Sequence, residues 1–214
     1  MSIAMKFCGI TRPEDAGFAA ELGAAYIGSI FTDSPRRVSP HDAAGIWAAA
    51  PGPKKVGVFG DASVDEILAA ADVSGLDVVQ LHRGAASGVI EQLRASFRGE
   101  IWSVIRIGDP GALAVAGESA DADAILVDSY SESGLGGTGR TFDWEREAAA
   151  IRRLIGDRRL VAAGGLDPDN VASAIRALAP DVVDVSSGVE SSPGVKDHAR
   201  MRAFAAAVAQ ADVD

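Results

Sequence analysis

The chain has 214 residues, a formal net charge of -10 and 48% hydrophobic residues, so it is long and apolar enough to bury one large core. Proteins bind the phosphate backbone of nucleic acids mainly through lysine and arginine, and the acidic balance therefore argues against a nucleic-acid partner. One cysteine excludes an internal disulfide, and the three histidines have no zinc-type spacing, so we expect no metal site.

No segment has the pattern of a signal peptide or a transmembrane helix. The N-terminal residues include no apolar stretch of signal-peptide length, and no uninterrupted apolar run approaches about 18 residues. We therefore expect a reduced, cytoplasmic protein that does not bind a membrane. Met1 and Met5 are both possible translation starts, and the sequence does not decide between them.

Short segments rich in apolar and β-branched residues recur along the whole chain and predict eight strands. They are Met5–Cys8, Tyr26–Phe31, Lys55–Phe59, Val78–Leu81, Ile101–Ile105, Ala124–Val127, Leu160–Ala162 and Val182–Val185.

Helical stretches lie between these strands. Thr11 to Glu14 and Ser63 to Glu66 have the spacing of capping boxes, and Pro13, Pro40 and Pro168 fit first-turn positions. The bounds that the pattern predicts are Pro40–Ala50, a weak Gly111–Ala116, Trp144–Leu154, Asp169–Leu178 and Asp197–Ala209.

Strict alternation of strand and helix predicts a parallel sheet covered by helices. Eight such units favour an α/β fold of the single (β/α)8 TIM-barrel type, with one catalytic domain spanning residues 1–214. The rival is an open doubly wound sheet, but the turn after the first strand, Cys8 to Thr11, lacks the glycine-rich dinucleotide fingerprint. In barrels of this kind the chemistry lies at the carboxyl ends of the strands.

Cys8 ends the first strand, directly before a helix. From its position alone an inert core residue is the more common interpretation. Free amides at a helix N-terminus favour a thiolate, however, and we expect them to lower the pKa of Cys8.

Asp128 follows the sixth strand and belongs to the same end of the predicted barrel. A loop cap or a solvated carboxylate is the alternative interpretation of Asp128.

The glycine-rich loop from Ser133 to Trp144, which contains Gly139, comes next. Its glycines allow close backbone approach to a ligand, although a flexible lid would have the same composition.

Small residues also follow the last two strands: Gly164 and Gly165 after the seventh, and Ser186, Ser187 and Gly188 after the eighth. Backbone amides in these two loops hold phosphate in many barrels. The alternative, plain tight turns, would make their placement a coincidence.

Six stretches together resemble the motifs of phosphoribosylanthranilate isomerases, in the order of that family. They are Lys6–Ala16 (KFCGITRPEDA), Ser34–Pro40 (SPRRVSP), Val79–His82 (VQLH), Gly136–Trp144 (GGTGRTFDW), Ala163–Asn170 (AGGLDPDN) and Asp184–Asp197 (DVSSGVESSPGVKD).

The resemblance implies a cofactor-free Amadori rearrangement of N-(5-phosphoribosyl)anthranilate, a small phosphosugar substrate, in tryptophan biosynthesis. It implies that Cys8 is the general base, Asp128 the general acid and Arg36 the active-site arginine. It also adds His82 and Asp184 to the substrate-binding residues, with Asp184 as a partner of the sugar hydroxyls; the alternative for Asp184 is a strand-end aspartate that caps a loop. Arg37, the next residue after Arg36, is then a solvated surface side chain.

Two positions depart from the family pattern: Arg83 follows His82 in place of glycine, and Arg106 stands where lysine is common. Neither is part of the acid–base pair. One alternative left open is a histidine-pathway or dual-substrate isomerase, which has a similar barrel but an aspartate at the position of Cys8. The other is a non-catalytic barrel that binds phosphometabolites. The sequence also leaves open whether the protein is a monomer or a homodimer.

Overall fold

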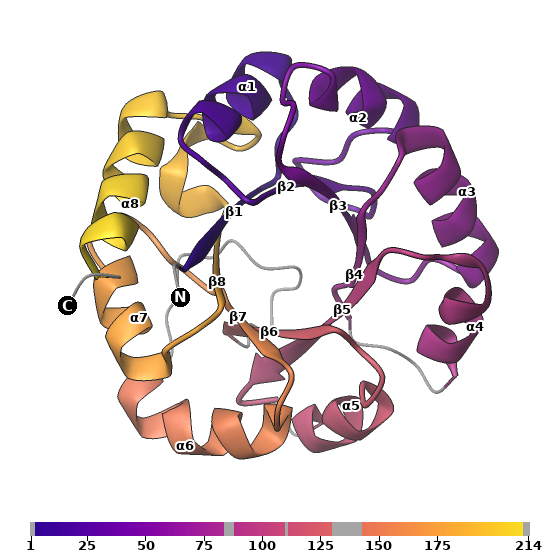
Figure 1. Cartoon of the computed structure of the whole chain (residues 1–214), viewed down its shortest axis with the longest axis vertical. Coiled ribbons are helices and arrows are strands. Elements are labelled where there is room, and N and C mark those ends of the chain that lie inside the picture. The colour runs from indigo at the N-terminus through magenta and orange to yellow at the C-terminus, as the bar shows by residue number, and fades with distance from the viewer. Residues whose placement is uncertain (1–2, 84–87, 110, 130–142, 212–214) are drawn as a thin grey trace.

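The computed structural model describes residues 3–83, 88–109, 111–129 and 143–211. Within them the parallel strands β1 to β8 pair in chain order, and β8 pairs with β1, which closes the barrel (Figure 1). The strands are β1 (Ala4–Cys8), β2 (Tyr26–Ile30), β3 (Lys54–Phe59), β4 (Val78–Leu81), β5 (Glu100–Ile107), β6 (Ala124–Ser129), β7 (Arg159–Ala162) and β8 (Val182–Val185). The predicted (β/α)8 barrel is therefore confirmed.

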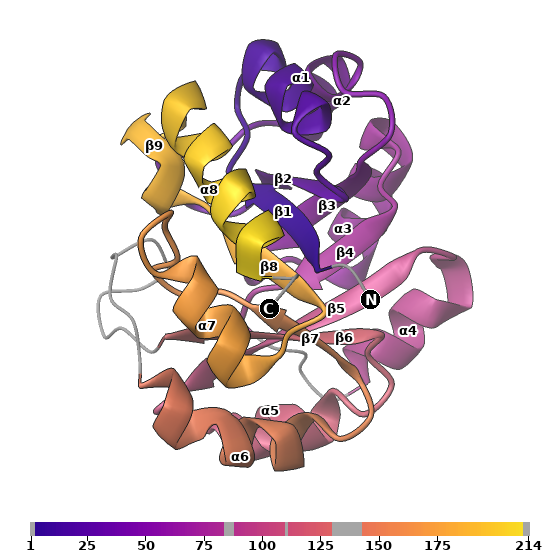
Figure 2. The same ribbon diagram turned by 60° about the vertical axis from the view of Figure 1, so that its left-hand side comes forward.

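Helices form a ring around the strands (Figure 1). They are α1 (Pro13–Glu21), α2 (Pro40–Trp47), α3 (Val64–Ser74), α4 (Val89–Ser96), α5 (Ala112–Glu118), α6 (Trp144–Ile155), α7 (Val171–Leu178) and α8 (His198–Ala211). Between β8 and α8 lie a 3-10 turn, η1 (Ser187–Val189), and an antiparallel hairpin of β9 (Glu190–Ser192) and β10 (Val195–Lys196). Figure 2 shows β9 beside α8. The sequence pattern did not predict this hairpin.

The interior of the barrel has an apolar middle layer. Tyr26 and Trp102 meet edge to face there, with ring centroids 4.8 Å apart, and valines and alanines of the other strands fill the remaining space. At the amino end of the strands Glu100 accepts hydrogen bonds from Lys54 and Arg159, each 2.6 Å long. The apolar layer and these ion pairs fill one end of the barrel, which leaves the other end for a ligand site.

Two predicted helix starts were wrong. Helix α1 begins at Pro13, which makes Arg12 rather than Thr11 the N-cap residue, and the Thr11 hydroxyl instead donates to Gly194 O in the β9–β10 turn. Helix α7 begins at Val171, so Pro168 precedes it. The carboxylate of Asp167 accepts the backbone N–H groups of residues 169 and 170, which holds this segment in a turn.

The other helix predictions need only boundary changes. The capping box of Ser63 and Glu66 is present, and Pro40 occupies the first turn of α2. Strand β6 continues through Ser129, so Asp128 lies on the strand and not after it. Among the helices of the described ranges, none has both the length and the apolar character needed to cross a membrane.

Candidate active site at the carboxyl end of the barrel

Alternate residues of a strand point to the same side, and at the carboxyl ends of four strands the inward residues are polar. Strand β1 contributes Lys6 and Cys8, and β6 contributes Asp128. Strand β4 contributes Gln80 and β8 contributes Asp184. All five are buried, so this polar layer lies inside the protein.

One cavity opens above this layer. The described residues that line it are Cys8, Ile30, Thr32, Ser34, Arg36, Val58, Gln80, His82, Leu126, Asp128, Ala163, Gly164, Gly165, Leu166, Asp184, Ser186 and Ser187. Nine of the predicted site residues are therefore brought together around a single space. Gly188 is not among them, and Gly139 lies outside the described residues.

Cys8 is only 7% exposed, and its surroundings differ from the expectation. Burial raises the pKa of its thiol, while the nearby ammonium groups of Lys6 and Lys196 oppose that rise. The prediction that free helix amides lower the pKa of Cys8 was wrong, because α1 begins only at Pro13 and desolvation of the thiol outweighs the favourable charges.

Lys6 has no exposed surface, and its Nζ donates a 2.8 Å hydrogen bond to Oδ2 of Asp184. These two residues are directly opposite each other in the β1–β8 pairing. Burial opposes the charge of Lys6, but the pKa of Lys6 is nevertheless raised because the Asp184 carboxylate stabilises the ammonium. The second carboxylate oxygen, Oδ1, is buried without a hydrogen-bond partner among the described residues.

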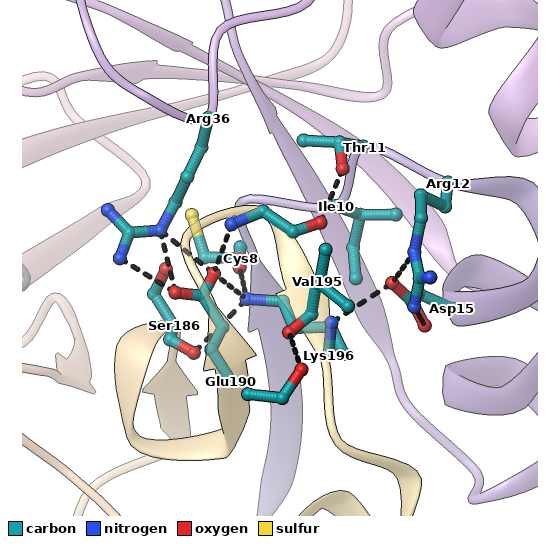
Figure 3. A network of polar contacts seen from close by, with 12 residues as sticks. Cys8, Ile10, Thr11, Arg12, Asp15, Arg36, Ser186, Glu190, Val195 and Lys196 are labelled. Carbon is teal, nitrogen blue, oxygen red and sulfur yellow. Dashed lines mark hydrogen bonds and ion pairs between the residues drawn. The ribbon is translucent and has the colours of Figure 1, made fainter.

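Arg36 comes from the loop after β2 and joins a buried network with Glu190 and Lys196 (Figure 3). Its Nε and Nη2 donate to the two carboxylate oxygens of Glu190 over 2.8 and 2.7 Å. Lys196 donates to the same carboxylate, to Cys8 O and to Ser186 O, over 2.9, 2.6 and 3.1 Å. The network thus links the ends of β1 and β8 with the loop that carries Arg36. Arg37 is exposed, as predicted.

Burial lowers the pKa of Lys196, although Glu190 opposes this effect. Burial also disfavours the Glu190 carboxylate, yet the pKa of Glu190 is lowered because Arg36 and Lys196 stabilise its charge. This part of the site is therefore an ion-pair network with two cations and one carboxylate.

His82 and Gln80 occupy the cavity wall on the β4 side. Desolvation, with a smaller contribution from the positive charge of Arg106, lowers the pKa of His82 to about 4, so the imidazole is neutral near pH 7. His82 Nδ1 and Gln80 Oε1 are buried and have no hydrogen-bond partner within the described part of the chain. Such groups are costly unless a ligand completes their hydrogen bonds.

The loops after β7 and β8 meet on the opposite side of the cavity. Gly164 and Gly165 have positive φ values of 86° and 69°, which glycine adopts without strain. A side chain at Gly188 would place its Cβ 1.9 Å from the backbone oxygen of Leu166. Gly188 therefore does not line the cavity, but it allows the two loops to pack closely.

The sequence interpretation missed the buried polar residues Lys6, Gln80, Glu190 and Lys196. Lys6 and Gln80 each lie two positions before a predicted site residue, so the strand period places them on the same inward face. Glu190 and Lys196 lie inside the last of the motif stretches, but their contact with Arg36 joins segments more than 150 residues apart. The described residues contain no group of three or more histidine, cysteine, aspartate or glutamate side chains that could hold a metal ion.

A family model and individual relatives of this chain indicate the same protein family. The model of the family described as N-(5'phosphoribosyl)anthranilate (PRA) isomerase matches residues 5–207. The N-(5'-phosphoribosyl)anthranilate isomerase of Geobacter sp. (strain M21) is 44% identical over 204 residues, which cover 94% of this chain and 96% of that protein. The relative from Rubrobacter xylanophilus is 40% identical and covers 95% and 97%.

Solved structures agree. Phosphoribosyl anthranilate isomerase from Thermotoga maritima superposes with a TM-score of 0.86 at 34% identity, covering 97% of this chain and 99% of that one. A phosphoribosyl anthranilate isomerase in complex with reduced 1-(o-carboxyphenylamino)-1-deoxyribulose 5-phosphate gives 0.83 at 33% identity, with the same coverage. The chain therefore belongs to the phosphoribosylanthranilate isomerase family, a family of enzymes of tryptophan biosynthesis.

Proposed function

We propose that this protein converts N-(5-phosphoribosyl)anthranilate to 1-(2-carboxyphenylamino)-1-deoxyribulose 5-phosphate, with Cys8 as general base and Asp128 as general acid. The observation that carries the proposal is that both side chains are buried and line the same cavity, on strands β1 and β6. We take the whole chain as one catalytic domain. Its cytoplasmic location and its monomeric or homodimeric state remain predictions from the sequence.

The reaction needs one acid and one base. A proton from Asp128 reaches the ribose ring oxygen as the bond between that oxygen and C1 breaks, which leaves an iminium between C1 and the anthranilate nitrogen. The iminium acidifies the hydrogen on C2, and the Cys8 thiolate removes that proton. The resulting enolamine tautomerises to the ketose, and the thiol returns a proton to Asp128 through the product or solvent. General acid–base steps of this kind contribute about 10²–10⁴-fold each.

The remaining cavity residues suit the two ends of such a substrate. Arg36 supplies a guanidinium suited to the anthranilate carboxylate or to the charge of the intermediate. Gly164, Gly165, Ser186 and Ser187 are the proposed phosphate-binding residues, together with Gly139, while Gly188 supports their loops. Asp184 and His82 would bind the sugar hydroxyls between these ends, because each has a buried polar atom without a partner in the described part of the chain.

The test is substrate consumption followed by fluorescence and coupled to indoleglycerol-phosphate synthase. Cys8→Ser removes the ionisable thiol, and Asp128→Asn keeps the size of the side chain but removes the transferable proton. Each should lower kcat on the order of a hundredfold or more. Asp72→Asn, at an exposed carboxylate of α3, is the matched control and should leave kcat unchanged.

Because both groups act on one reaction coordinate, the double variant should be little worse than either single variant. A Cys8→Ser enzyme that keeps more than about a tenth of wild-type kcat would overturn the assignment of the base. Turnover of the histidine-pathway substrate, a larger aminoaldose with two phosphates, is measured in parallel. The alternative function requires that this substrate is converted.

A further inference from the structure

The charged groups buried around Cys8 do not balance. Among the described residues, Lys6, Arg36 and Lys196 are the cations of this cluster, while Asp184 and Glu190 are its carboxylates. His82, on the other side of the cavity, is neutral near pH 7 because its pKa is about 4. With Asp128 in the neutral acid form that the proposed reaction requires, the described residues of this cluster carry three positive charges against two negative ones. A thiolate at Cys8 would supply the missing negative charge.

The cations are not equally free to meet that thiolate. The ammonium of Lys196 has three N–H donors, and they go to Glu190, Cys8 O and Ser186 O. The guanidinium of Arg36 is engaged by Glu190. The ammonium of Lys6 has one carboxylate acceptor in the described part of the chain, Asp184, and therefore has donors to spare.

The position of Lys6 brings those donors to the sulfur. Lys6 and Cys8 are two residues apart on β1 and so share the inward face. Both pack on Gly28, which is opposite Cys8 in the β1–β2 pairing. A Cβ at Gly28 would lie 3.2 Å from Cys8 Sγ and 3.3 Å from Lys6 Nζ, so the absence of a side chain there leaves the space that both atoms occupy.

We propose that Lys6 is a positioning residue for the reaction: its ammonium, fixed by Asp184, stabilises the thiolate of Cys8 while that thiolate removes the C2 proton. The inference rests on the proposed role of Cys8 as base. Stability alone gives little reason for such a pair, because a buried ion pair commonly contributes no more than an apolar pair of similar volume. The favourable charge of Lys6 instead offsets part of the burial effect that disfavours the thiolate.

The test reads the thiolate directly. Cys8 is the chain's single cysteine, so the rate of its alkylation by iodoacetamide, followed against pH by mass spectrometry, reports its ionisation. Lys6→Met should slow alkylation at neutral pH about tenfold or more, with the same rate as wild type at the alkaline plateau, where access alone matters. Lys54→Met is the matched control, since Lys54 is a strand lysine paired with a carboxylate at the opposite end of the barrel. Its profile should match that of wild type.

Asp184→Asn gives a second, independent reading, and it decides the question if Lys6→Met does not fold. Removing the carboxylate takes away a charge that repels the thiolate and leaves Cys8 as the anionic partner of the Lys6 ammonium, so alkylation at neutral pH should be faster. The proposal is overturned if Lys6→Met and Asp184→Asn both follow the wild-type alkylation profile, or if Asp184→Asn does so when Lys6→Met is unfolded.

The acid limb of kcat/KM separates this proposal from the function itself. It should move to higher pH in Lys6→Met together with the alkylation profile. If alkylation shifts while the acid limb stays in place, Lys6 stabilises the thiolate but Cys8 is not the base, and the proposed function fails instead.

Discussion

The guanidinium of Arg36 and the carboxylate of Glu190 face each other in a bidentate pair, with N–O distances of 2.8 and 2.7 Å, although 153 residues separate them in the chain. Both side chains are at least nine-tenths buried. The pair fixes the loop after β2 against the hairpin after β8. An arginine held in this way has little rotamer freedom left to lose when it meets a substrate.

Replacing Glu190 with glutamine should therefore impair both stability and catalysis. The change leaves the buried charges of Arg36 and Lys196 without their carboxylate, and we expect a loss of about 3 kcal/mol in the free energy of unfolding. It should also lower kcat/KM, since Arg36 is no longer held. Urea unfolding and the coupled assay measure the two effects. Glu21→Gln, at an exposed carboxylate of α1, is the control, and an unchanged unfolding midpoint in Glu190→Gln would contradict the structural role.

The neighbouring arginines allow a sharper comparison. Arg36→Met removes a buried guanidinium that lines the cavity, whereas Arg37→Met removes one from an exposed position of the same loop. We expect kcat/KM to fall on the order of a hundredfold in the first variant, as when a single charge-stabilising donor is lost, and to stay near wild type in the second. Equal small effects would place Arg36 among the structural residues only.

The sequence predicts those features of the fold that depend on contacts between residues close together in the chain. The local hydrophobic pattern predicts strands such as Val78–Leu81, and residues three apart predict the Ser63 capping box. Both predictions were confirmed. The helix start near Thr11 was wrong because the Thr11 hydroxyl bonds to Gly194, at the other end of the chain. No local pattern contains that partner.

The same distinction applies to the site. The strand period brings Cys8, Asp128 and Ser186 to one end of a barrel, and the structure places all three on one cavity. The pKa of Cys8 could not be predicted, because it depends on burial, on the charges of Lys6 and Asp184, and on Lys196, which reaches the site from a hairpin that the sequence pattern did not indicate. To predict the pKa of a group, one must know its neighbours in three dimensions, and many of these come from distant segments of the chain.

Phosphate should stabilise the folded protein through the loops after β7 and β8. A ligand that binds only the folded state raises the melting temperature by mass action, so millimolar inorganic phosphate should outperform chloride of equal ionic strength. In Gly188→Ala the new Cβ would meet Leu166 O at 1.9 Å, so the loops must separate. We expect a loss of about 1–3 kcal/mol in stability and a weaker response to phosphate.

Gly45→Ala is the matched control for that substitution. Gly45 lies on the exposed face of α2, and its Cβ would have no atom within 4 Å, so alanine should be neutral or stabilising by up to about 1 kcal/mol. Its response to phosphate should equal that of wild type. If phosphate stabilises wild type no better than chloride does, these loops are not the phosphate site.

Because of His82, we expect the free energy of unfolding to fall on mild acidification. Its pKa is about 4 in the folded protein, against 6.5 for an ordinary histidine, because the buried imidazole is held neutral. Above about pH 6.5 both the folded and the unfolded chain carry a neutral His82, and the group costs nothing. As the pH falls below that value the unfolded chain takes up the proton first, and the free energy of unfolding should drop by about 2 kcal/mol at about pH 5.

Urea unfolding at about pH 7 and about pH 5 measures this difference. The interval also lies above the range in which Asp15 and Glu190 titrate, because these two carboxylates have lowered pKa values and their stabilising contributions are lost only below about pH 4.5. His82→Gln should remove most of the drop between the two pH values. His41→Gln, at an exposed position in the first turn of α2, should keep it. A drop of the same size in His82→Gln as in wild type would show that another group takes up the proton, and that His82 is not held neutral in the cavity wall.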